Sequence, residues 1–455
     1  MKATAPHTLT ATQNACKLCA PLGAAMVFKG IARAMPLLHG SQGCATYIRR
    51  YLISHYKEPI DIACSNFSEQ TAIFGGGANL QLALDNIQRQ YTPDLIGVAT
   101  TCLSETIGDD VPLFLKEYCN ARKAMPLPAI VNVSTPSYQG THMDGFHRAV
   151  DATVASLVSE RTDVSTRINF LPGMLSPADL RHLKEILADF AQPAILLPDY
   201  SDTLDGPLWT EYQHLPRGGT SVVDLRQMGN ADATLSFGRT FSKGEARAAR
   251  LLQNRCGVPA YELGLPIGIR ETDRFFEVLQ TVSGHPIPGK YRAERGRLID
   301  SYVDGHKYVM EAKAVVYGEA DLVIGIAAFL TEIGVIPVIC ATGERNGRLE
   351  AELAATIPDY ETRGIRIMED ADFVDIEATA EKLKADFFIG NSKGYAMARR
   401  LHLPMIRIGF PVHDRLGASR RLHIGYRGTQ QLFDEIANTL IAARQSDSTV
   451  GYTYM

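Results

Sequence analysis

Short apolar, β-branched runs alternate with longer segments of helical periodicity from about residue 94 to residue 408. Each run ends at a turn, often marked by Gly or Pro, after which apolar positions recur every three to four residues. The predicted strands are 95–99, 129–133, 167–171, 194–197, 313–317, 335–340, 364–368, 386–389 and 405–408. A helix predicted over 321–333 joins two of them. Because parallel strands need a crossover, which is usually a helix, the pattern predicts an α/β fold with parallel sheets.

Chain length predicts about three domains, since 455 residues are roughly three times a typical domain of about 150. Polar stretches near residues 165 and 300 are the expected boundaries. We therefore expect three Rossmann-like domains, over residues 1–165, 166–300 and 301–455. The glycine run at 75–77 leads into a predicted helix but lacks the later glycine of a dinucleotide fingerprint, so a nicotinamide cofactor is not expected.

Composition narrows the possible partners. Lys and Arg number 46 against 50 Asp and Glu, a formal charge of -4, which argues against nucleic-acid binding. The most apolar stretch, 322–340, contains Glu332, Gly334 and Pro337, so we expect no membrane span. Residues 1–14 are predicted to be a short polar arm rather than a signal peptide. We expect a cytoplasmic protein.

Cysteines are the most informative residues. Six of the eight lie within the first 119 residues, and in a reducing compartment clustered thiols indicate metal or redox chemistry. Cys16 and Cys19 form a CxxC pair, but no second pair follows, so a zinc site is weakly indicated. Four cysteines are predicted to be ordinary buried thiols: Cys64, Cys119, Cys256 and Cys340.

Three thiols lie beside turns. Cys19 precedes a turn-like segment, Cys44 follows Gly43, and Cys102 follows the strand 95–99, while Ser137 follows the next strand. Glycines around Ser41 and Gln42 let backbone amides such as that of Gly43 approach a bulky ligand. Thiolates on separate loops suit an iron–sulfur cluster. Three are one short of a four-iron set, so either a partner chain or the Ser137 hydroxyl completes it.

These residues belong to motifs that resemble the β-type subunits of the nitrogenase component 1 family. The resemblance covers essentially the whole chain. The motifs are Cys19-Ala-Pro-Leu-Gly, His39-Gly-Ser-Gln-Gly-Cys44, His55-Tyr-Lys-Glu-Pro59, Phe74-Gly-Gly76, Thr100-Thr-Cys102, Glu105-Thr-Ile-Gly-Asp-Asp110, Thr135-Pro-Ser137, Gly268-Ile-Arg-Glu-Thr-Asp273, Gly409-Phe-Pro-Val-His-Asp414 and His423-Ile-Gly-Tyr-Arg-Gly428.

The resemblance implies a cofactor and its ligands. Spacings of 25, 58 and 35 residues separate Cys19, Cys44, Cys102 and Ser137 in turn and match the family's ligands for the eight-iron P-cluster, [8Fe–7S]. By resemblance the three cysteines hold half of the cluster, and Ser137 is the candidate ligand on oxidation. An α-type (NifD- or NifE-like) partner in an α2β2 heterotetramer holds the other half. The alternative cofactor is a shared [4Fe–4S] cluster. Amides of Gly43 and Gly23 are expected to tune the cluster's potential.

Three branches of the family remain open. A nitrogenase-like reductase, for instance one cleaving the C–S bond of methylthio-alkanes, would relay electrons from an ATP-dependent iron protein. A NifN-type scaffold would instead mature the iron–molybdenum cofactor together with NifE. A nitrogenase β subunit would serve dinitrogen reduction. The complete Cys–Cys–Cys–Ser set favours the reductase, residues 47–55 resemble NifN-type chains, and a first cluster cysteine at position 19 disfavours molybdenum nitrogenase.

No catalytic residue is expected in this chain. It has no credible nucleophile–base pair, no HExxH and no Gly-rich phosphate loop ending in Gly-Lys-Ser/Thr, so ATP should bind the iron protein. Glu69 and Asp109 are predicted to be solvated loop or helix-cap residues, and His39 a core histidine with satisfied hydrogen bonds. Alone, the chain should be catalytically inert.

Overall fold

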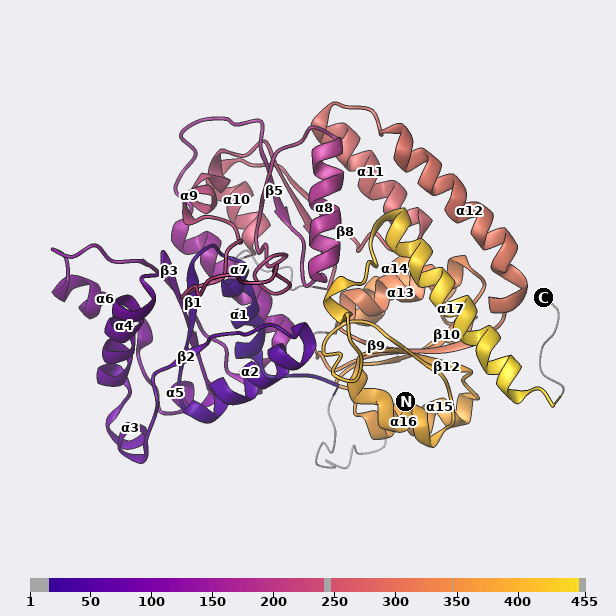
Figure 1. Cartoon of the computed structure of the whole chain (residues 1–455), viewed down its shortest axis with the longest axis horizontal. Helices are drawn as coiled ribbons and strands as arrows, with labels where there is room; N and C mark the ends of the chain where they lie inside the picture. Colours follow the sequence, from indigo (N-terminus) through magenta and orange to yellow (C-terminus); the bar gives the residue numbers. More distant parts are fainter. Residues whose placement is uncertain (1–15, 241–246, 346, 450–455) are drawn as a thin grey trace, which may run out of the picture.

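A computed structural model describes residues 16–240, 247–345 and 347–449. The predicted polar arm at 1–14 lies outside the described residues. Within the described residues the strands form three sheets, and every pairing between strands is parallel, as the alternating pattern predicted. Figure 1 shows the first sheet on the left, the second above and the third on the right.

The first sheet has the order β2-β1-β3-β4, with β1 Ala34–His39, β2 Ala63–Cys64, β3 Leu95–Thr100 and β4 Ala129–Val133. β3 and β4 were predicted. β1 is buried along its whole length but was not predicted, because its sequence, AMPLLH, contains no β-branched residue. The carboxyl ends of β1, β3 and β4 lead into the segments that carry Cys44, Cys102 and Ser137.

The second sheet has the order β6-β5-β7-β8: β5 Ile168–Leu171, β6 Ala194–Leu196, β7 Ala233–Phe237 and β8 Ala260–Leu263. The third has the order β11-β10-β9-β12-β13: β9 Lys313–Gly318, β10 Ile336–Thr342, β11 Arg366–Met368, β12 Phe387–Gly390 and β13 Met405–Arg407. Both β5 and β6 and all five strands of the third sheet were predicted, whereas β7 and β8 were missed. Helix α13, Ala320–Glu332, is the predicted crossover between β9 and β10.

Helices cover the faces of the sheets. Their bounds are α1 Ala20–Lys29, α2 Gln42–Tyr56, α3 Glu69–Phe74, α4 Gly77–Tyr91, α5 Cys102–Thr106, α6 Val111–Ala121, α7 His142–Leu157, α8 Pro177–Asp189, α9 Val222–Arg226, α10 Ala248–Cys256, α11 Ile269–Ser283, α12 Gly289–Val309, α14 Leu349–Thr356, α15 Phe373–Leu383, α16 Tyr395–Arg400 and α17 Gly425–Asp447. Short 3₁₀ turns include η1 Ser137–Gln139, η3 Ser392–Gly394 and η4 Ala418–Arg420.

The contact between α1 and α7 positions Cys19. Their backbones approach so closely that a Cβ on Gly23 would lie 1.7 Å from the His142 carbonyl oxygen, and one on Gly145 would lie 1.8 Å from the Ala20 carbonyl oxygen. Glycine at both positions therefore lets α1 dock against α7. Cys19 directly precedes Ala20, the first residue of α1.

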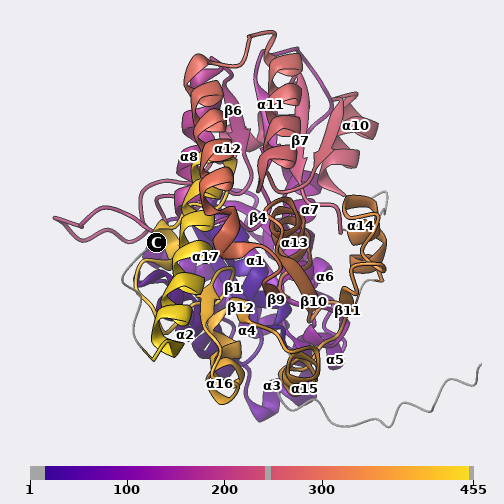
Figure 2. The same ribbon diagram turned by 90° about the vertical axis from the view of Figure 1, so that its right-hand side faces the viewer.

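The three sheets share one buried core. Val131, Phe170 and Val316, from the first, second and third sheets, belong to the same cluster of buried apolar side chains. The C-terminal helix α17 packs along α12, as Figures 1 and 2 both show. The division into domains at residues 165 and 300 remains a prediction: residue 165 lies between α7 and β5, and residue 300 lies inside α12.

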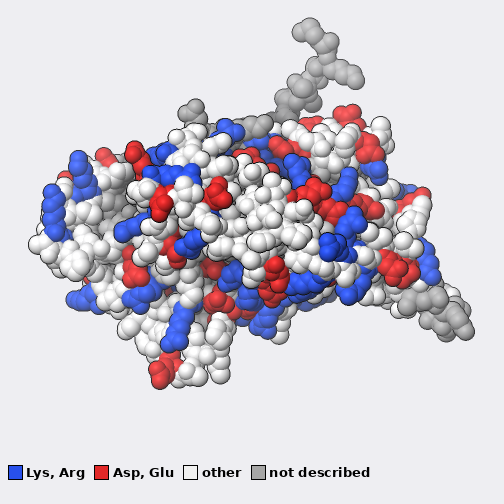
Figure 3. All heavy atoms as spheres, turned by 90° about the horizontal axis from the view of Figure 1, so that it is seen from above, with Lys and Arg blue, Asp and Glu red and all other residues white. Residues whose placement is uncertain are grey.

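Surface charge is mixed, in keeping with the near balance of acidic and basic residues. On the face in Figure 3, Lys and Arg side chains are interspersed with Asp and Glu. Among the described residues, no helix combines the length and apolar character needed to cross a bilayer.

Candidate metal-binding site

All three predicted cysteine ligands lie at helix N-termini. Cys19 is the N-cap of α1, Cys44 lies in the first turn of α2, and Cys102 is the first residue of α5. Cys102 is exposed, and the other two thiols are half-buried. Amide N–H groups without intrahelical partners point outward at a helix N-terminus, and this arrangement stabilises anionic thiolates.

The thiols of Cys102 and Cys44 are near enough to Cys19 to affect its pKa. Burial raises the pKa of the Cys19 thiol, a hydrogen bond with Ser137 lowers it, and negative charge on Cys102 and Cys44 raises it further. The structure therefore brings together the four residues that the spacing singled out. Residues from four separate segments converge because β1, β3 and β4 are parallel neighbours and end at the same edge of the sheet.

Ser137 connects two of these cysteine segments. Its hydroxyl oxygen accepts a hydrogen bond from the Ala20 N–H, with the two atoms 3.2 Å apart. Its own N–H donates to the Cys102 Sγ at 3.2 Å. The Ser137 hydroxyl therefore satisfies the first amide of α1.

Gly43 and Gly23 differ in whether packing within this chain requires a glycine at the position. A Cβ on exposed Gly43 would meet only the Ser41 Oγ, at 3.9 Å, so packing within this chain does not require a glycine. The Ser41 hydroxyl donates to the Cys44 Sγ at 3.7 Å, on the same turn. Gly23 is required by the close approach of α7. Of these two glycines, Gly43 is therefore the one whose backbone a bulky group can approach.

Other cysteines have different surroundings. Burial raises the pKa of Cys16 to about 12, so this thiol stays protonated. The pKa of its CxxC neighbour Cys19 is affected by burial and also by Ser137, Cys102 and Cys44. Cys256 and Cys340 are buried, as predicted, whereas Cys64 and Cys119 are half-buried against the core. Within the described ranges, no three His, Cys, Asp or Glu side chains form a site for a single metal ion.

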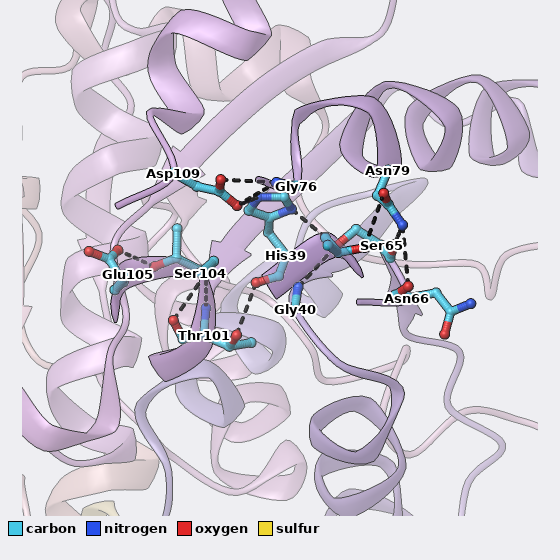
Figure 4. A network of polar contacts seen from close by, with 12 residues as sticks. His39, Gly40, Ser65, Asn66, Gly76, Asn79, Thr101, Ser104, Glu105 and Asp109 are labelled. Carbon is cyan, nitrogen blue, oxygen red and sulfur yellow. Dashed lines mark hydrogen bonds and ion pairs between the residues drawn. The ribbon is translucent and has the colours of Figure 1, made fainter. Parts of the chain in front are cut away.

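A buried polar network lies at the ends of β1 and β3, which lead into the segments that carry Cys44 and Cys102 (Figure 4). His39, at the end of β1, has one ring nitrogen 3.0 Å from the Ser65 Oγ and the other 3.0 Å from an Asp109 carboxylate oxygen. Asp109 also accepts a hydrogen bond from the Gly76 N–H at 3.0 Å. The prediction for His39, a core histidine with satisfied hydrogen bonds, is confirmed.

The prediction that Asp109 is solvated is wrong, although its carboxylate does hydrogen-bond at the N-terminus of a helix, α4. Its side chain is only 3% exposed, because His39 and the Gly76 amide supply the donors that burial of a carboxylate requires. Burial lowers the pKa of His39 and the Asp109 carboxylate partly opposes that shift. Glu69 is exposed in the first turn of α3, as predicted.

Sequence reasoning missed two charged residues near the thiols. Glu105 accepts hydrogen bonds from the hydroxyls of Thr100 and Ser134, which joins the ends of β3 and β4. Lys393, in the third sheet's η3 turn, donates to the Lys17 carbonyl oxygen at 3.1 Å. The motif around Glu105 could have indicated the first, but a separation of 376 residues leaves no local signal for the second.

Comparisons with known proteins show the family. The family model described as nitrogenase component 1 type oxidoreductase matches residues 19–441. The chain is 36% identical over 437 residues to the nitrogenase molybdenum-iron protein beta chain of Clostridium pasteurianum, covering 96% of this chain and 94% of that one. It is 34% identical to the iron-molybdenum cofactor biosynthesis protein NifN of Bradyrhizobium diazoefficiens, covering 98% and 92%.

Structural similarity is equally extensive. A solved chain titled nitrogenase Cp1 at pH 6.5 superposes with a TM-score of 0.93 at 34% identity, over 100% of this chain and 98% of that chain. The Clostridium pasteurianum match also removes the argument from position 19, because a molybdenum-iron beta chain can be matched over 94% of its length by a chain of this size.

Proposed function

The chain belongs to the nitrogenase component 1 type oxidoreductase family, and on that basis we propose that it is a β-type subunit that holds half of a shared iron–sulfur cluster and serves electron relay. Cys19, Cys44 and Cys102 are the proposed thiolate ligands, and Ser137 is the proposed ligand on oxidation. The single observation that carries the proposal is the convergence of these four residues at one edge of the first sheet.

The donor set fits a polynuclear iron–sulfur cluster. The sulfurs influence one another electrostatically, yet among the described residues they form no site for a single ion. Thiolates spread around a larger group are what an iron–sulfur cluster requires, and such a group supplies reversible one-electron storage. Exposed Cys102 and Gly43 leave one side open to an α-type partner carrying the other ligands.

The residues of this chain position and protect those ligands. The Ser137 N–H holds the Cys102 sulfur, and the Ser137 hydroxyl lies between Cys19 and the first amide of α1. A serine hydroxyl must lose its proton to bind iron, so ligation by Ser137 couples proton release to oxidation. Gly43 is exposed, and its amide is the one that we expect to tune the potential by hydrogen bonding.

Partners complete the activity. We propose an α2β2 assembly with an α-type (NifD- or NifE-like) subunit, which receives electrons from an ATP-dependent iron protein. The reduced substrate, whether dinitrogen or a methylthio-alkane, then depends on the partner's metallocluster. Acetylene, dinitrogen and methylthio-alkane reduction by the purified complex, assayed side by side, distinguish these substrates.

A second function, the NifN-type cofactor scaffold, is supported by the 34% identity to the Bradyrhizobium diazoefficiens protein over 98% of this chain. It differs from the relay in its cluster. A scaffold with a shared [4Fe–4S] cluster shows a four-iron EPR signal in the reduced state. A P-type [8Fe–7S] relay shows a signal that emerges on oxidation.

Iron analysis of the complex co-purified with its α-type partner tests the proposal. We expect Cys44→Ala and Cys102→Ala to remove about eight irons per heterodimer, since cysteine thiolates hold such clusters. Cys119→Ala is the matched control, because Cys119 is a half-buried thiol on α6 that packs against the core away from the site. Unchanged iron in both site variants excludes the relay and the shared-cluster scaffold together, whereas a loss of about four irons with a reduced-state signal selects the scaffold.

A further inference from the structure

The segment that carries Cys19 is held by loops of the third sheet. The Cys16 N–H donates to the Ala371 carbonyl oxygen at 3.0 Å, and the Lys17 ammonium pairs with Asp370 at 2.7 Å. Gly343, directly after β10, approaches Cys16 so closely that a Cβ there would lie 2.1 Å from the Cys16 carbonyl oxygen. Residues more than 300 positions apart in sequence therefore fix the backbone just before α1.

Lys393 brings a positive charge to this junction. It lies in η3, directly after β12, and its half-buried ammonium donates to the carbonyl oxygen of Lys17, two residues before Cys19, at 3.1 Å. Its Nζ also lies over the Phe373 ring, 5.9 Å from the ring centre. The hydrogen bond to a backbone atom defines where the charge lies relative to the thiol.

The turn that carries Lys393 is itself fixed. The side chain of buried Asn391 accepts the Lys393 N–H at 3.2 Å, and the Asn391 carbonyl oxygen accepts the Tyr317 hydroxyl at 2.7 Å. A Cβ on Gly394 would lie 2.3 Å from that same hydroxyl oxygen. The ammonium thus projects from a rigid turn anchored to β9 rather than from a surface loop.

Electrostatics couple Lys393 to the thiols. Its charge lowers the pKa of Cys19 and of Cys16, against the larger effect of burial. Burial lowers the pKa of Lys393, and negative charge on Cys19 and Asp372 opposes that shift. The neighbouring cation Lys17 is paired with Asp370 at a side-chain exposure of 37%, where solvent screens it.

We propose that Lys393 is a positioning residue that raises the reduction potential of the iron–sulfur cluster held by Cys19, through a fixed positive charge supplied by the third sheet. A nearby cation stabilises the reduced state more than the oxidised one, because reduction adds negative charge. The inference rests on the proposed function, since it requires Cys19 to be a cluster ligand. It assigns the third sheet an electrostatic role at a site built on the first.

A redox titration followed by EPR on the complex with the α-type partner tests this inference. Lys393→Met keeps the length of the stem and removes the charge, Lys393→Gln keeps an N–H donor without the charge, and Lys393→Arg keeps the charge. We expect Met and Gln to lower the equilibrium constant for one-electron reduction about tenfold, a shift of about 59 mV to more negative potential. Arg should stay near the wild-type midpoint.

Lys382→Met is the matched control, because it removes the same charge from the exposed last turn of α15 and should leave the midpoint unchanged. Unchanged midpoints in both neutral variants, with iron retained, overturn the inference. So does loss of iron in both neutral variants but not in Arg, which would make Lys393 a residue that retains the cluster. If the Cys19→Ala complex keeps all the iron of the wild-type complex, the proposed function is refuted instead. The two failures are therefore distinguishable.

Discussion

The imidazole of His39 and the carboxylate of Asp109 lie 3.0 Å apart, with side-chain exposures of 0% and 3%. This pair joins the end of β1 to the loop after α5, and the Gly76 amide extends it to the start of α4. Buried polar contacts, and not apolar packing alone, therefore hold in place the ends of the strands that lead into the cysteine segments.

Replacing Asp109 with Ala should destabilise the chain by about 3 kcal/mol, because it leaves His39 and the Gly76 amide without an acceptor in a buried site. Urea unfolding of the complex, followed by circular dichroism, measures the loss. The control is Glu69→Ala, an exposed carboxylate in the first turn of α3, which should change stability by less than about 0.5 kcal/mol. Equal midpoints for the two variants would show that the buried pair contributes nothing.

His55 should make stability fall with decreasing pH. Burial, reinforced by His413 and Lys57, lowers the pKa of His55 from 6.5 to about 3, and its Nδ1 accepts the Val412 N–H at 2.9 Å. Between pH 6.5 and about 3 the unfolded chain binds a proton at His55 that the folded chain does not. The contribution of His55 to the free energy of unfolding is therefore fully retained above pH 6.5. Below pH 6.5 it declines by up to about 1.4 kcal/mol per pH unit.

His55→Gln tests this pH dependence, since an amide oxygen can accept the Val412 N–H and does not titrate. We expect the variant's unfolding free energy to have a shallower slope between pH 6.5 and 5, by one bound proton. Identical slopes for wild type and variant would contradict the assignment. The comparison of slopes, rather than of absolute stabilities, isolates the proton from any packing change.

The two glycines at the contact between α1 and α7, Gly23 and Gly145, should not tolerate a side chain. Gly145→Ala places a Cβ 1.8 Å from the Ala20 carbonyl oxygen, so α1 must move and the chain should lose about 1–3 kcal/mol together with iron from the complex. Gly296→Ala, in the exposed middle of α12 with no atom near the new Cβ, should instead gain about 0.5–1 kcal/mol. Thermal unfolding and iron content of both variants decide the matter; equal behaviour would refute the steric argument.

Ser137→Ala should retain iron but change the oxidised state. The variant keeps the backbone N–H to the Cys102 sulfur and loses the hydroxyl that accepts the Ala20 N–H, a cap contributing about 1 kcal/mol. EPR of the oxidised complex should lose the wild-type signal if the hydroxyl binds iron. Ser68→Ala, which removes the N-cap of α3, is the control for a lost cap without that chemistry. An unaltered oxidised spectrum in Ser137→Ala would remove Ser137 from the ligand set.

Local pattern predicted some strands better than others, for a physical reason. All five strands of the third sheet were found, because runs such as that of β9 are apolar and β-branched. β1 was missed, since it contains Pro36 and His39 and no β-branched residue. It is nonetheless buried at every position. Its identity as a strand comes from pairing with β2 and β3 on both sides, which no local window contains.

Sequence alone determined the residue types and spacing of the candidate ligands, the parallel α/β architecture and the family to which the chain belongs, because these depend on short-range pattern and ordered motifs. Tertiary structure decided which side chains meet. Burial of Asp109 against His39, the contact of Ser137 with Cys102 and the position of Lys393 beside the Cys19 segment join residues 35 to 376 positions apart. Such contacts follow from how parallel strands end at a common edge and how the sheets pack together, and no local preference encodes them.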